Sequence, residues 1–182
     1  MTDNGPDEHD GPPRALMIAA LAVAALAVVA LLVVAAVREV PEQPRPVALA
    51  GVPAPQADDD ACRALHDALP ESLGEYQRAT LVDPAPVGAA AWQSESQPEP
   101  VVLRCGLERP VDFVAGTPVQ AVDDVDWFRI GEQDRSTWIA VDRPVYVALT
   151  LPDGSGPTPI QLISSAIASA MPEVPIKPGP LR

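Results

Sequence analysis

An uncharged apolar run near the N-terminus places the strongest limit on how this chain can fold. Residues 15–37 read ALMIAALAVAALAVVALLVVAAV and contain no charged residue, proline or glycine. As an α-helix this run would be about 34 Å long, at ~1.5 Å per residue, which is enough to cross a hydrocarbon core of about 30 Å. We therefore predict a transmembrane helix over residues 15–37, through which the chain contacts the membrane.

Two other interpretations of the apolar run fit less well. A cleaved signal peptide has an apolar core of only ~7–15 residues, followed directly by a cleavage site of small residues. The nearest such site, Ala48-Leu49-Ala50, lies well beyond the run. A buried helix in a soluble protein would need a larger interior than a domain of this size provides. A retained anchor is the preferred interpretation.

The flanking charges leave the orientation of this helix open. The positive-inside rule counts nearby Lys and Arg residues, and Arg14 precedes the run whereas Arg38 and Arg45 follow it. On charge alone the C-terminal side could be cytoplasmic. A short N-terminal tail, a single span and a downstream cysteine pair favour the opposite. We predict a single-pass plasma-membrane protein whose C-terminal domain lies outside the cytoplasm.

Composition divides the rest of the chain into a folded domain and three polar or proline-rich segments. Residues 1–14 are polar and acidic, which predicts a disordered tail. Residues 38–57 contain five prolines, which favour an extended linker. We place the folded domain at residues 58–171, and a proline-rich tail that is extended or disordered at residues 172–182.

The start of the domain has the pattern of a short helix. Cys62, Leu65 and Leu69 fall on one helical face, the aspartates at 58–60 can cap the N-terminus, and Pro70 ends the helix. A second helix is predicted near the end of the domain.

That second helix covers residues 158–171, with Thr158 as its N-cap and Pro159 at its first position. Between the two helices, strand patterns with β-branched and aromatic residues occur at 101–107, 125–130, 136–141 and 144–151. The last three are separated by short polar turns, which suggests an antiparallel meander. The predicted fold is thus α+β: a transmembrane helix, a proline-rich stalk, and a small antiparallel sheet with two helices.

The two cysteines, Cys62 and Cys105, most simply form a disulfide if the domain is exported. In VVLRCGL a period of two places Cys105 with Leu103 and directs Arg104 to the opposite face. The alternatives are a redox-active pair, a single nucleophilic thiol activated by the arginine, and a metal site built from the two cysteines and His66.

Other candidate chemistry is weaker, and no catalytic, cofactor-binding or metal residue is assigned. Asp123, Asp124 and Asp126 form a carboxylate cluster without the spacing of a calcium loop, which favours a solvated turn. Ser155 lies in the turn PDGSGP and has no identifiable base, and glycine patterns that bind phosphate are absent.

Aromatic residues offer a further hypothesis. Trp92, Trp127, Trp138 and Tyr146 could line a groove for a carbohydrate or peptide, but three of them lie in predicted strands, where core packing is the simpler expectation. The formal net charge of −13 argues against nucleic acid as a partner, because such binding requires a basic surface.

Four motifs in order resemble a known family: CRALHDALPESL (62–73), VVLRCGLERP (101–110), VDW (125–127) and DRPVYVALTLP (142–152). The family is actinobacterial and is described only as a domain of unknown function, family 3515. The resemblance covers about residues 62–171, and its most specific element is Leu103–Gly106. One departure is Gln93, where a glycine is expected after the tryptophan.

The resemblance implies an anchored or exported envelope protein with no assigned activity. Together with the anchor, the linker and the cysteine pair, it favours a non-enzymatic module that binds or assembles another envelope protein or polymer. The alternative is an envelope enzyme or a redox protein whose site cannot be identified from the sequence.

Overall fold

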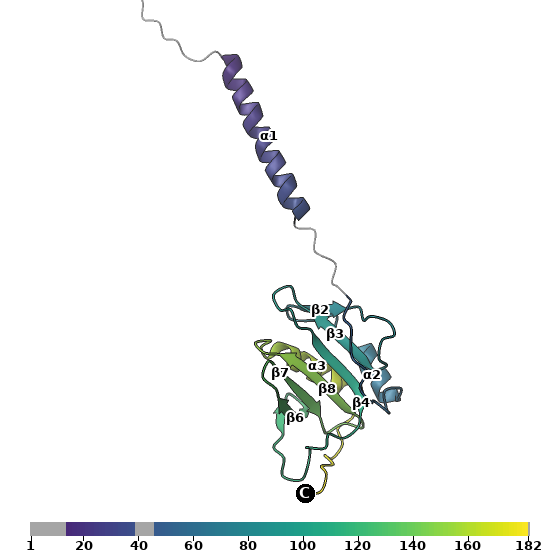
Figure 1. Cartoon of the computed structure of the whole chain (residues 1–182). Coiled ribbons are helices and arrows are strands. Elements are labelled where there is room, and N and C mark those ends of the chain that lie inside the picture. Colours follow the sequence, from purple (N-terminus) through teal and green to yellow (C-terminus); the bar gives the residue numbers. More distant parts are fainter. Residues whose placement is uncertain (1–13, 39–45, 182) are drawn as a thin grey trace, which may run out of the picture. The chain divides into compact units, whose positions relative to one another are not determined.

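The computed structural model describes residues 14–38 and 46–181 and divides the chain into two compact units, Met1–Gln43 and Pro44–Arg182 (Figure 1). Apart from Arg14, the predicted acidic tail at residues 1–14 lies outside the described residues.

The described part of the first unit is one long helix, α1, which spans Arg14–Arg38 and includes the whole apolar run. Alanine and leucine are strong helix formers, and the run contains no glycine or proline to interrupt it. The segment Ala15–Val34 is long and apolar enough to cross a membrane, and none of it is buried by protein. A helix that is apolar on every side is stable where lipid or protein surrounds it. A single-pass anchor is the simplest use for it.

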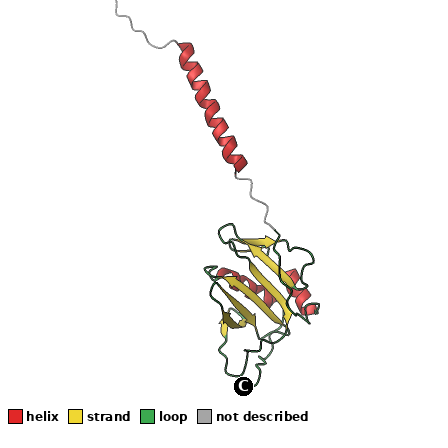
Figure 2. Cartoon of the chain, in the orientation of Figure 1, coloured by secondary structure: helices red, strands yellow, loops and turns green. Residues whose placement is uncertain are grey.

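The second unit is an α+β domain, as the sequence predicts. Its described part contains one antiparallel sheet of eight strands and two helices (Figure 2). Along the chain these are α2 (Asp60–Ala68), β1 (Ser72–Leu73), β2 (Tyr76–Ala79), β3 (Ala89–Gln93), β4 (Val101–Leu107), β5 (Gln120–Val122), β6 (Val125–Gly131), β7 (Arg135–Ala140), β8 (Tyr146–Pro152) and α3 (Thr158–Ala170). The strand order in space is β1-β2-β3-β4-β8-β7-β6-β5.

The predicted meander is formed by β6, β7 and β8, which are antiparallel neighbours. Strand β4 then pairs with β8, with Leu103 opposite Leu149, and so joins the two halves of the sheet. The short strands β1, β2, β3 and β5 were not individually predicted. Strand β3 reads AAAWQ, and alanine has little intrinsic preference for strands, so its conformation depends on its neighbours in the sheet.

The main core lies between one face of the sheet and the two helices. Ile160, Ile163 and Ile167 of α3 are buried there, as the predicted stripe requires. Trp92 and Trp127 are the largest of the core side chains. The indole nitrogen of Trp127 donates to Ser164 Oγ at 3.0 Å, so its polar group is satisfied inside the core.

The helix starts match the sequence at α2 and differ by one residue at α3. Asp59 caps α2, and its carboxylate accepts a hydrogen bond from the Ala61 N–H at 2.9 Å. In α3, however, Thr158 is already helical and Pro157 occupies the N-cap position without a side-chain hydrogen bond. Pro157 has a φ of −83° and a ψ of −20°, so the helical path begins one residue earlier than predicted.

The opposite face of the sheet is covered by extended chain, part of which was assigned to the linker. Val47 is buried and forms a parallel bridge with Leu81. The Gln56 N–H donates to the Gly106 carbonyl at 3.0 Å. Of the predicted linker at residues 38–57, residues 39–45 lie outside the described residues. Residues 46–57 do not form a free linker: Val47 and Ala57 are buried, and the segment ends in a turn at residues 55–58 that packs on the domain.

The C-terminal tail is also extended and attached. Val174 N–H donates to the Asp142 carbonyl at 2.9 Å, and Gly179 bridges to Val114. Beside this attachment, Phe113 packs on Phe128 with ring centroids 5.6 Å apart. Of the two alternatives given for residues 172–182, the described residues of the tail show the extended one.

Candidate functional site

The two cysteines are joined by a disulfide between helix α2 and strand β4. Cys62 and Cys105 have a Cα–Cα distance of 5.6 Å, and both side chains are buried. Arg104 lies on the other face of the sheet, as the strand period predicts, and its Nη2 donates to the Ala50 carbonyl at 3.0 Å. The arginine is therefore not placed to activate a thiol, and it fastens the covering segment instead.

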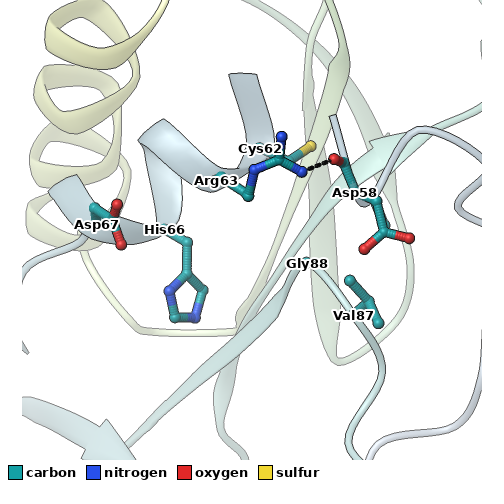
Figure 3. Close-up of a pocket in the computed structure, with 8 residues that line it drawn as sticks. Asp58, Cys62, Arg63, His66, Asp67, Val87 and Gly88 are labelled. Atoms are coloured by element: carbon teal, nitrogen blue, oxygen red, sulfur yellow. Dashed lines mark hydrogen bonds between the residues drawn. The ribbon is translucent and has the colours of Figure 1, made fainter. Parts of the chain in front are cut away.

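A pocket of about 310 Å³ lies beside this disulfide (Figure 3). In Figure 3 the side chain of Arg63 reaches the Asp58 carbonyl, while the His66 ring extends from the next turn of α2. The metal hypothesis required thiolates from Cys62 and Cys105, which the disulfide removes. Among the residues that the structure describes, no group of three His, Cys, Asp or Glu side chains is arranged to hold a metal.

Asp123 and Asp124 of the carboxylate cluster form the tight turn between β5 and β6, and Asp126 lies in β6. Asp123 has a positive φ of 50°, a conformation that aspartate tolerates better than most residues. The turn is held through its backbone: the Asp126 N–H donates to Asp142 Oδ2 at 3.0 Å. This geometry is that of a structural turn, consistent with the solvated-turn interpretation.

The turn is held by a buried ion pair between Asp142 and Arg143, which was not predicted from the sequence. Arg143 Nη1 donates to Asp142 Oδ2 at 2.8 Å, and the two side chains are only 2% and 6% exposed. Arg143 also donates to the Asp124 carbonyl. Burial raises the pKa of Asp142, while the Asp126 N–H and Arg143 act in the opposite direction. The signal available in the sequence was an adjacent Asp-Arg pair between two apolar strands.

The aromatic-groove hypothesis, the weaker alternative to core packing, does not hold for Trp92, Trp127 or Tyr146. Trp92 and Trp127 are fully buried in the main core. Tyr146 packs on the opposite face of the sheet, against the cluster that contains Phe113. Trp138 is partly exposed and lines a groove.

This groove, which we call the Trp138 groove, has a volume of about 460 Å³, within the usual range for ligand sites. It lies among the β6–β7 hairpin, the turn that follows β8 and the first turn of α3. Its polar and aromatic lining includes Arg129, Gln133, Ser136, Trp138, Ser155 and Gln161. The turn PDGSGP, which contains Ser155, is thus one wall of the groove.

Hydrogen bonding and charge hold the Trp138 side chain in place. Its indole nitrogen donates to Ser136 Oγ at 3.0 Å. The guanidinium carbon of Arg129, directly across the strand pair, lies 5.5 Å from the centroid of the ring. The site can therefore offer a fixed aromatic ring, a cation and several hydrogen-bonding groups to one ligand.

The fold and the groove define a class: a chain with an N-terminal helix apolar enough to span a membrane, followed by a disulfide-linked α+β domain. The family described as "Protein of unknown function (DUF3515)" matches residues 21–176, which cover most of the chain, including much of α1. The chain belongs to this family, as the sequence motifs suggest. No curated protein and no solved structure matches it.

Proposed function

We propose that this protein is a single-pass membrane-anchored binding module of the cell envelope, and that the Trp138 groove is its ligand site. The main observation that supports the proposal is the position of Trp138. The other two tryptophans serve the core, whereas Trp138 lies partly exposed on the groove wall with its polar group satisfied by Ser136. Tryptophans with one accessible side are common in binding sites.

The way the chain packs supports a retained anchor. The small-residue site Ala48-Leu49-Ala50 follows Val47, which is buried and bridged to Leu81. The Ala50 carbonyl accepts a hydrogen bond from Arg104. Cleavage there would remove Val47 and its bridge to Leu81 from the folded domain, so the packing of this segment favours its retention.

The groove chemistry supports binding over catalysis. Ser136 is engaged by the Trp138 indole, and the groove lining contains no histidine or lysine. Its carboxylates are Glu132, which pairs with Arg135, and Asp153, and among the described residues neither is hydrogen-bonded to Ser155. Nucleophilic catalysis requires a base within hydrogen-bond reach of the nucleophile. The lining therefore favours recognition of an envelope polymer or protein rather than its hydrolysis.

Fluorescence of Trp138 tests this proposal in the full chain, held in detergent micelles. Soluble fragments of envelope polymer, prepared by digesting the cell wall of the source cells, are expected to protect wild-type tryptophan from quenching by acrylamide. Trp138→Phe removes the protected signal, because Trp92 and Trp127 are already buried. Trp138→Ala should weaken binding at least 10-fold, which is about 1.4 kcal/mol. Because this variant lacks the reporting tryptophan, its affinity is measured by the fluorescence anisotropy of dye-labelled fragments.

Leu162→Ala is the matched control, since Leu162 is exposed on α3 and does not line the groove. It should bind the fragments as the wild type does. Absence of protection in the wild type, or protection that survives Trp138→Phe, would count against the groove as a ligand site.

A further inference from the structure

We infer that the Trp138 groove binds its ligand through a carboxylate group, and that Arg129 is the residue that holds it. This inference rests on the proposed function and names the chemical class of the ligand. It depends on three observations: where the Arg129 guanidinium lies, that no carboxylate of a described residue pairs with it, and that it covers the ring of Trp138.

The position of Arg129 prepares its guanidinium for a ligand. Arg129 on β6 is paired directly with Trp138 on β7, and its guanidinium lies against the indole ring. An arginine held over an aromatic ring keeps its N–H groups free at the edge of the guanidinium. Those groups match the two oxygens of a carboxylate, which arginine binds in a two-pronged manner.

The charges in the groove leave Arg129 available. Arg135, the other arginine of the lining, lies within 4.0 Å of three carboxylates, those of Glu99, Glu132 and Asp134. In contrast, no carboxylate of a described residue forms an ion pair with Arg129. In a chain with 25 acidic residues, a groove arginine without such a partner is the local site for an external anion.

The remaining lining limits how the ligand lies. Asp153 is the carboxylate of the groove that does not pair with Arg135, and it belongs to the turn that carries Ser155. A negatively charged group is therefore repelled at that turn and attracted at Arg129. Gln133 and Gln161 can hydrogen-bond to neutral polar parts of the same ligand.

The same geometry disfavours a neutral sugar as the main recognition element. A sugar ring stacks on an open aromatic face, but the guanidinium of Arg129 already lies over the Trp138 ring. A carboxylate can bind the arginine without displacing it. The carboxylate can belong to a peptide or to an acidic sugar, and these two sources share the chemistry recognised by Arg129.

Chemical neutralisation of the ligand tests the inference in the full chain. The probes are the soluble cell-wall fragments, either untreated or with their carboxylates converted to methylamides by carbodiimide and methylamine. We expect the untreated fragments to bind wild-type protein at least 10-fold more tightly, measured by protection from acrylamide. Arg129→Gln should remove this difference, whereas Arg63→Gln should keep it, because Arg63 is an exposed arginine of α2 that does not line the groove.

The outcomes separate the inference from the proposed function. Equal affinity for both fragment preparations, or a difference that persists in Arg129→Gln, overturns the carboxylate inference and leaves the groove intact as a ligand site. Binding of neither preparation overturns both. An unchanged urea-unfolding midpoint in Arg129→Gln shows that a loss of discrimination is not a loss of folding. Separate peptide and glycan fractions of the fragments then identify which source carries the carboxylate.

Discussion

Replacing both Cys62 and Cys105 by alanine is expected to lower the free energy of unfolding of the domain by about 4 kcal/mol. The disulfide closes a loop with a sequence separation of 43 and joins the first helix of the domain to the central strand β4. Its loss restores the conformational freedom of that loop in the unfolded chain. Because a small domain is stable by only ~5–15 kcal/mol in total, the double variant should accumulate poorly.

Urea unfolding followed by tryptophan fluorescence measures this effect. All three tryptophans lie in the domain, so the signal does not depend on α1. The control repeats the urea unfolding in the presence of a reductant. The reductant should lower the unfolding midpoint of the wild type toward that of the double variant, and it should leave the midpoint of the double variant unchanged. A wild-type midpoint that stays the same after the disulfide has been fully reduced to two thiols would contradict a stabilising disulfide.

Replacing Gly106 by alanine is expected to cost at least about 3 kcal/mol. A Cβ at this position would lie 2.3 Å from both Ala57 N and the Gln56 carbonyl carbon, and these are backbone atoms that cannot turn aside. The φ of +84° adds strain of about 1–2 kcal/mol for any residue with a Cβ. Displacing the segment also breaks the hydrogen bond from Gln56 to the Gly106 carbonyl, worth about 1 kcal/mol.

Gly116→Ala is the matched control for this prediction. Gly116 has nearly the same φ, +86°, but a Cβ there would meet nothing within 4 Å. It should therefore show only the backbone strain, about 1–2 kcal/mol. The difference between the two variants, again from urea unfolding, measures the packing of the segment around Gln56 and Ala57 on the sheet. Equal losses would mean that this segment contributes nothing to stability.

The motif LRCG illustrates how much of the fold could be predicted from the sequence. The alternation of apolar residues placed Cys105 toward the core and Arg104 on the opposite face, and the structure agrees on both. The reason for Gly106 was not predictable, because its neighbours Gln56 and Ala57 are distant in sequence and lie in what composition indicated was a linker. Prolines favour extended chain, but they do not tell whether that chain is free or packed on a sheet.

The candidate site was only partly predictable for the same reason. Trp127 and Trp138 both occur in strand-like patterns. Strand periodicity predicts which face of the sheet a side chain lies on, but not how far it lies from the edge of the core. Trp138 is accessible because a groove separates it from the turn after β8 and from the first turn of α3. The buried pair of Asp142 and Arg143 was missed because each polar residue in a turn is exposed by default, and only tertiary contacts bury it.

Cross-linking from inside the groove in intact cells tests the proposed function most directly. A photoreactive residue at position 161 replaces Gln161, which lines the groove, and the control carries it at the next position in place of exposed Leu162. The predicted result is a covalent adduct with an envelope component from position 161 only, reduced by Arg129→Gln. No adduct from position 161, equal adducts from both positions, or adducts only with cytoplasmic proteins would contradict an envelope-facing binding groove.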